Sequence, residues 1–206
     1  MKRFLTSLLI TASVVAGVFA ANPKYNVDRQ AISSAVSDHG AYKALADRFA
    51  TGQKLSTSDM AALYYGTALQ PGFSATQTYP DINRTYAAGD YTTTLSQVWK
   101  ALAKDPANLY LLFTGYGAAR SLNNQEAADL LQTRLLQVCD LIFASGMGVS
   151  QDSPYVVLRP SDIDEFLVKY IQPTTINGRA KISNLEAVRV NIDGVPDDVI
   201  MYFKQF

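Results

Sequence analysis

The chain has 206 residues, of which 48% are hydrophobic and 17% are charged. This length fits one domain, or one domain with an appendage, and excludes an array of many repeats. The hydrophobic share is enough for a core, and the composition has none of the features of disorder. Eighteen basic residues balance 18 acidic ones, which argues against a surface built to bind nucleic acid.

The first twenty residues are typical of a secretory signal peptide. Lys2 and Arg3 precede an apolar stretch over 4–18, and small residues lead to a predicted cleavage site after Ala20. The apolar stretch is shorter than a membrane-spanning helix requires, so we expect no integral membrane span after cleavage. The mature chain, 21–206, is therefore expected to be exported to the periplasm or the cell exterior.

Cys139 is the only cysteine of the chain. Because it lies far from the cleavage site, the sequence does not encode a bacterial lipoprotein. One cysteine cannot close an internal disulfide, so burial must stabilise the fold in an oxidising compartment. Its place four residues after Leu135 and four before Phe143 favours a small buried side chain over a reactive thiol.

The first part of the mature chain has the apolar spacing of helices. We expect two helices within 27–52, separated near His39. Ser56, with an acidic residue three positions later, resembles a capping box and opens a short helix that ends at Gly66. Prolines and small polar residues over 70–84 predict a long loop that lies against the body of the protein.

The clearest helical pattern lies between Gly89 and Pro106. Its apolar positions recur at spacings of four, three and four, at Tyr91, Leu95, Val98 and Leu102. A Gly-Asp-Tyr start, a small alanine and a late proline at these spacings resemble the second helix of a tetratricopeptide repeat. Helices over 109–121 and 126–145 are expected to form a degenerate second unit. Because such repeats cannot bury their faces alone, the rest of the chain must cover them.

The last quarter of the chain mixes strand and helix patterns. Residues 155–158 predict a short strand, and Ser161 is expected to cap a helix that Pro173 ends. Apolar and polar residues alternate over 188–192, and 199–203 predict the returning strand of a hairpin.

These elements together predict one α+β domain over 21–206. A mostly helical, tetratricopeptide-like layer occupies 27–148 in this interpretation. A β-rich part with a small antiparallel sheet occupies 149–206 and covers one end of the helical layer.

Three short motifs accompany the signal peptide and the β-rich tail. They are Leu-Tyr-Tyr-Gly at 63–66, Gly-Asp-Tyr at 89–91 and Ser-Gly-Met-Gly at 145–148. Taken together, these features resemble the bacterial family called domain of unknown function 4919. The resemblance covers nearly all of the mature chain and implies an extracytoplasmic protein with no established activity.

The residues give little sign of catalysis, metal binding or a cofactor. His39 is the only histidine, and no serine lies in a nucleophile elbow that would complete a triad with it. One histidine and one cysteine cannot form an ordinary zinc site. Asp193, Asp197 and Asp198 lack the spacing of a calcium loop and are interpreted as turn residues. We therefore predict no catalytic residue, no metal site and no cofactor.

Asp162, Asp164 and Glu165 leave an alternative open. Two carboxylates about 5–10 Å apart can serve a glycosidase-type reaction, whereas acidic residues in the first turn of a helix complement its dipole. The second reading is the simpler one. A cofactor-independent hydrolase of sugars or peptides would need a cleft in which two of these acids, or one of them and the 193–198 turn, face each other.

Aromatic residues are the remaining functional signal, because the chain has 12 Tyr against 9 Phe and 1 Trp. Tyrosine can lie half in water and can bind peptide or sugar. Tyr64 and Tyr65 are adjacent on one helix and must point in different directions, so we expect at least one to face outward or toward the loop with Phe73 and Tyr79. These four residues are the predicted binding surface.

The leading hypothesis is an exported, non-catalytic module of the cell envelope that binds a protein. Glycan binding without catalysis is the first alternative, and the hydrolase is the second. Nucleic acid is not an expected partner.

Overall fold

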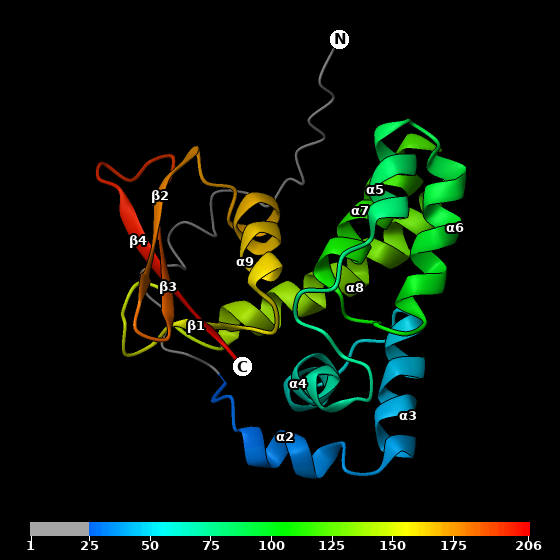
Figure 1. The fold of residues 1–206 in the computed structure, drawn as a ribbon, viewed down its shortest axis with the longest axis horizontal. Coiled ribbons are helices and arrows are strands. Elements are labelled where there is room, and N and C mark those ends of the chain that lie inside the picture. The colour runs from blue at the N-terminus through cyan, green and yellow to red at the C-terminus, as the bar shows by residue number, and fades with distance from the viewer. Residues whose placement is uncertain (1–24) are drawn as a thin grey trace.

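A computed structural model describes residues 25–206 of the chain. The predicted signal peptide and its cleavage site lie outside the described residues. Helices fill one side of the molecule and a four-stranded sheet lies at the other (Figure 1), which confirms the predicted α+β class. No helix within 25–206 is long and apolar enough to cross a membrane.

The helical part begins most of its helices with a side-chain cap. Its elements are α2 (Arg29–Ala35), α3 (His39–Ala50), α4 (Thr57–Gly66), the 3₁₀ turn η1 (Thr67–Leu69), α5 (Pro80–Ala87), α6 (Tyr91–Leu102), α7 (Leu109–Ser121) and α8 (Gln125–Ala144). A short polar side chain accepts a hydrogen bond from a first-turn backbone N–H of α2, α3, α4, α6, α7 and α8. These caps are Asp28, Asp38, Ser56, Asp90, Asn108 and Asn124.

Most of the predicted helices are present, and the expected loop over 70–84 is wrong at its end. Helix α5 begins at Pro80, because a proline at the first helical position loses no hydrogen bond and its fixed φ suits the helix. The irregular segment therefore covers 70–79. In space α5 packs on α6, α6 on α7 and α7 on α8; the tetratricopeptide resemblance of this layer stays a prediction.

The sheet contains one strand that the sequence pattern did not indicate. Its strands are β1 (Tyr155–Val157), β2 (Thr175–Ile182), β3 (Leu185–Asn191) and β4 (Val199–Gln205), in the order β1-β4-β3-β2. Every residue of β2 is exposed, so it has no buried face to create an alternating pattern. The β2–β3 and β3–β4 pairs are antiparallel, but β1 joins β4 in parallel. The sheet is therefore mixed, where we expected an antiparallel one.

Helix α9 (Pro160–Phe166) and the π-helical turn η2 (Leu167–Ile171) follow β1. In Figure 1, α9 stands between the sheet and the pair α7 and α8. The predicted Ser161 cap is wrong, because Pro160 already occupies the first helical position. Instead the carboxylate of Asp162 accepts a hydrogen bond from the backbone N–H of Arg159 (3.0 Å).

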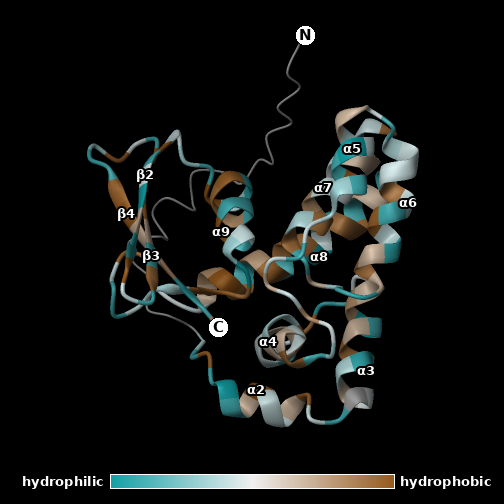
Figure 2. Ribbon diagram, in the orientation of Figure 1, coloured by the Kyte–Doolittle hydropathy of each residue, from teal (hydrophilic) through white to brown (hydrophobic). Residues whose placement is uncertain are grey.

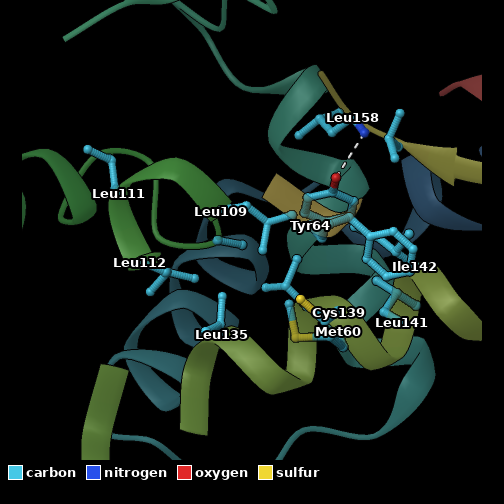
Figure 3. Close-up of a cluster of buried hydrophobic side chains, with 14 of the residues drawn as sticks. Met60, Tyr64, Leu109, Leu111, Leu112, Leu135, Cys139, Leu141, Ile142 and Leu158 are labelled. Carbon is cyan, nitrogen blue, oxygen red and sulfur yellow. Dashed lines mark hydrogen bonds between the residues drawn. The ribbon is translucent and has the colours of Figure 1, made fainter. Parts of the chain in front are cut away.

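One cluster of buried hydrophobic side chains extends from α2 to β4. Hydrophobic residues of α8 run through the middle of the molecule (Figure 2). Cys139 of this helix belongs to the same buried cluster as Met60 and Tyr64 (Figure 3). Cys139 is fully buried, as predicted, and burial raises the pKa of its thiol well above the usual range. The thiol is therefore a packing group at physiological pH.

Arg134 is a buried cation that joins α8 to the segment after α6. Its Nη2 donates to the backbone carbonyl of Pro106 (2.9 Å), and its guanidinium lies 5.0 Å from the ring centre of Phe49 and 5.9 Å from that of Trp99. Burial lowers its pKa to about 10. The group stays charged at neutral pH. The faces of the two aromatic rings attract the cation, as a carboxylate would otherwise do.

Candidate functional site

A cavity of about 710 Å³ opens between the irregular segment 70–79, the start of α5 and the end of α6. Its size falls within the range of small-ligand sites, about 300–1,000 Å³. Pro71 within the segment and Pro80 after it restrict its backbone. The segment predicted to lie against the body of the protein thus forms one wall of this cavity.

The lining of the cavity combines aromatic rings with amide and hydroxyl groups. Phe73 and Tyr79 supply the rings. The ring of Tyr79 stacks on that of Tyr110 at 5.9 Å with an angle of 7° between the planes, so it is held in place from outside the cavity. The amide and hydroxyl groups belong to Thr67, Gln70, Ser74, Gln77, Thr78 and Gln97. Such groups donate and accept hydrogen bonds without a fixed charge.

A buried ion pair includes Asp105, one of the residues that line the cavity. Arg159 Nη2 donates to Asp105 Oδ2 at 2.6 Å, and only 2% of the Arg159 side chain and 16% of the Asp105 side chain are exposed. The Arg159 guanidinium also lies 5.0 Å from the ring centre of Phe73. Burial lowers the pKa of Arg159, but the carboxylates of Asp105 and Asp162 outweigh it and raise the pKa. Arg159 is therefore a permanent cation.

The ion pair leaves three polar atoms unused. Asp105 Oδ2 accepts a second hydrogen bond from Asn108 Nδ2 (2.8 Å), whereas Asp105 Oδ1 has no partner among the residues that the structure describes. Nε and Nη1 of Arg159 have none within the same residues. An unpaired buried polar group is costly. Asp105 lines the cavity, but its Oδ1 is itself shielded from solvent.

A second carboxylate connects this ion pair to the core. Asp162 Oδ2 accepts hydrogen bonds from Tyr64 Oη (2.6 Å) and from the backbone N–H of Arg159. Tyr64 Oη accepts in turn from the backbone N–H of Leu158 (2.9 Å; Figure 3). Burial raises the pKa of Asp162 to about 6, against the opposing field of Arg159. We call Tyr64, Asp105, Asn108, Arg159 and Asp162 the buried polar network.

The four residues of the predicted binding surface divide into two pairs. Phe73 and Tyr79 are half-buried and line the cavity. Tyr64 and Tyr65 are fully buried, and their hydroxyls bond to Asp162 and to the carbonyl of Val156. One residue of each pair meets Arg159: Phe73 lies over its guanidinium, and Tyr64 bonds to Asp162, which accepts from its backbone N–H. A binding role for these residues stays a prediction.

The acidic residues weighed for catalysis have structural partners. Asp162 belongs to the buried polar network, and Asp164 forms an ion pair with Arg179 of β2. Asp198 accepts two hydrogen bonds from the side chain of Asn177. Burial raises the pKa of Glu165 to about 7, with Lys169 opposing the shift. Among residues 25–206, no group of three or more His, Cys, Asp or Glu side chains could hold a metal ion.

Sequence reasoning missed the charged groups of the site. Lys100 and Lys104 have the spacing of one helix face and precede Asp105 in the cavity lining, but lysines at a helix end are explained by the helix dipole. Arg159 ends the apolar run Val-Val-Leu before a proline. A charged residue in that position was the available sign of a buried ion pair.

The family model called domain of unknown function (DUF4919) matches residues 30–204. The chain belongs to this family. The match covers both the cavity and the buried polar network, so the predicted resemblance is confirmed over nearly the whole described fold. No curated protein and no solved structure matches this DUF4919 protein.

Proposed function

We propose that this DUF4919 protein is an exported, non-catalytic binding protein that takes part of a sugar chain in the cavity between segment 70–79 and α6. The observation that carries the proposal is the lining of this cavity, which places the rings of Phe73 and Tyr79 beside amide and hydroxyl groups. Sugar hydroxyls donate to carboxylates and amides, and the apolar face of a sugar ring packs on an aromatic ring.

The shape of the site favours a sugar over the protein partner that we ranked first from the sequence. A cavity of this volume holds a small ligand or one segment of a chain, whereas protein interfaces bury about 800 Å² on each side. The hydrolase alternative has less support, because Asp162 and Asp164 are engaged by Tyr64 and Arg179.

A protein partner keeps one specific observation in its favour. Strand β2 is the outer strand of the sheet, and its Ile176 and Ile182 are 37% and 39% exposed. Exposed edge strands pair with strands of other proteins. This second candidate surface is separate from the cavity, so both kinds of binding are compatible.

The test measures binding of the purified protein to an array of neutral and acidic oligosaccharides, followed by calorimetry of those retained. We expect Phe73→Leu to weaken binding about tenfold, because it keeps an apolar side chain but removes the flat ring. Tyr86→Leu is the matched control, since Tyr86 is exposed and does not line the cavity. Binding to no sugar, or binding that Phe73→Leu leaves unchanged, would overturn the proposal.

A further inference from the structure

Once ion pairs are taken into account, the side chains that line the cavity carry an excess of positive charge. Four charged side chains line it: Asp81, Lys100, Lys104 and Asp105. Each aspartate has an arginine partner, since Arg84 Nη2 lies 2.7 Å from Asp81 Oδ1 and Arg159 Nη2 lies 2.6 Å from Asp105 Oδ2. The two lysines form no ion pair with any carboxylate of residues 25–206.

The two lysines lie on the same side of the chain. The backbone N–H of Asp105 bonds to the carbonyl of Ala101 (3.0 Å), so the helical path of α6 continues through residue 104. Residues four positions apart on such a path are neighbours, and like charges at this spacing repel. An anion placed between Lys100 and Lys104 relieves that repulsion.

Arg159 does not add to the charge of the two lysines, because it forms a buried ion pair with Asp105. The ring of Phe73 lies over its guanidinium, 5.0 Å from the ring centre. The excess positive charge of the cavity lining is therefore that of Lys100 and Lys104.

We infer that the cavity selects a sugar carrying an anionic group, a carboxylate or a sulfate, over the same sugar without one. This inference rests on the proposed function and narrows its ligand class. The anion lies near the ammonium groups of Lys100 and Lys104, while the amide and hydroxyl groups of the lining bond to the sugar hydroxyls. A cationic ligand is disfavoured, because both aspartates of the lining are already neutralised by arginines.

The test compares sugars that share a backbone and differ only in charge. One pair of probes is oligogalacturonides and their methyl esters; the other is sulfated and unsulfated galacto-oligosaccharides. We expect the acidic member of at least one pair to bind about tenfold more tightly than its neutral partner. This preference should shrink as sodium chloride rises from about 0.05 M to about 0.5 M. The pair that shows the preference identifies the anionic group.

Two double variants test whether the lysines of the cavity cause the preference for the acidic sugar. Lys100→Ala/Lys104→Ala should remove the preference, so that the acidic and the neutral sugar of a pair bind with equal affinity. Lys43→Ala/Lys54→Ala removes the same charge at two positions that do not line the cavity, and this variant should keep the preference. Equal binding of acidic and neutral sugars, still weakened by Phe73→Leu, would overturn this inference and leave the proposed function standing. Binding to no sugar at all would overturn both.

Discussion

At the scale of single residues, the central feature of this protein is a charge that is buried and only partly satisfied. Arg159 is 2% exposed and shares one close contact with Asp105. Removing one partner of a buried ion pair destabilises a protein strongly, by about 3–5 kcal/mol, because the other charge is left alone. Asp105 is therefore unsuitable for a binding variant, and its role has to be tested through its neighbours Phe73, Lys100 and Lys104.

The raised pKa values of two other acidic residues predict how the stability of the fold depends on pH. Burial raises the pKa of Asp162 to about 6 and that of Glu165 to about 7, above the ordinary values of 3.8 and 4.5. The folded state thus holds protons that the unfolded state releases. Their stabilising contribution is complete below the ordinary values and is lost as pH rises through 6 and 7. We expect the midpoint temperature of thermal unfolding to decrease as the pH rises from about 5 to about 8.

The variant Glu165→Gln isolates one of these two groups. It has no proton to lose, so the decrease of the midpoint between pH 5 and pH 8 should be smaller than in the unchanged protein. Glu126→Gln makes the same chemical change at an exposed position and should keep the full decrease. Thermal unfolding followed by circular dichroism measures both. A midpoint that rises with pH in the unchanged protein would contradict the assignment.

At the scale of elements, the loop after α8 shows why two glycines are needed near β1. Gly148 has a φ of +73°, and a Cβ on it would lie 2.0 Å from the ring of Tyr155. A Cβ on Gly146 would lie 2.1 Å from the carbonyl oxygen of Pro154. The Gly148 carbonyl accepts a hydrogen bond from the backbone N–H of Tyr202 in β4 (2.6 Å). The loop therefore packs directly against the sheet.

Gly148→Ala should be strongly destabilising. The methyl group adds a clash with Tyr155 to the cost of a left-handed backbone, and we expect a loss of about 3 kcal/mol or more in the free energy of unfolding. Gly194→Ala is the matched control, because Gly194 has a φ of +81° with nothing within 4 Å of the added Cβ. It should lose only about 1–2 kcal/mol from backbone strain. Urea unfolding of both variants measures the difference, and equal losses would argue against close packing at Gly148.

At the scale of the whole molecule, buried tyrosines join the helical part to the β-rich part. Tyr64 Oη bonds to Asp162 of α9 and to the backbone of Leu158, and Tyr65 Oη donates to the carbonyl of Val156 in β1 (2.9 Å). Apolar contacts continue across the same boundary, since α8 packs on β1 and α7 on α9. We therefore expect the two parts to unfold together.

The variant Tyr64→Phe tests this coupling. It leaves the Asp162 carboxylate and the Leu158 N–H without their shared partner, so the unfolding free energy should fall by about 2–3 kcal/mol. The fluorescence of Trp99 in α6 and the hydrogen exchange of β3 and β4 should report the same loss.

The control for this variant is Tyr42→Phe. It removes the hydrogen bond to Thr67 (2.8 Å), which lies within the helical part, and should cost about 1 kcal/mol. Unchanged hydrogen exchange in β3 and β4 of Tyr64→Phe would show that the two parts unfold independently.

The sequence by itself determined the elements that have a strong local signal. Helices α6 to α8 combine apolar periodicity with Asp90, Asn108 and Asn124 as caps, and these are properties of residues a few positions apart. The hairpin of β3 and β4 follows from alternation and the turn at Gly194. The family was also predicted from short motifs, and the match over 30–204 confirms it.

Only the tertiary structure decided what depends on contacts between distant segments. Strand β2 has no buried face, so its edge position comes from pairing with β3. Local periodicity also gives no sign that β1 pairs with β4 in parallel. The cavity and its ion pair bring Phe73, Asp105 and Arg159 together from three separate parts of the chain. Local patterns report which side chains prefer burial, whereas the partner of a buried charge is fixed by packing between elements, and that packing created the candidate site.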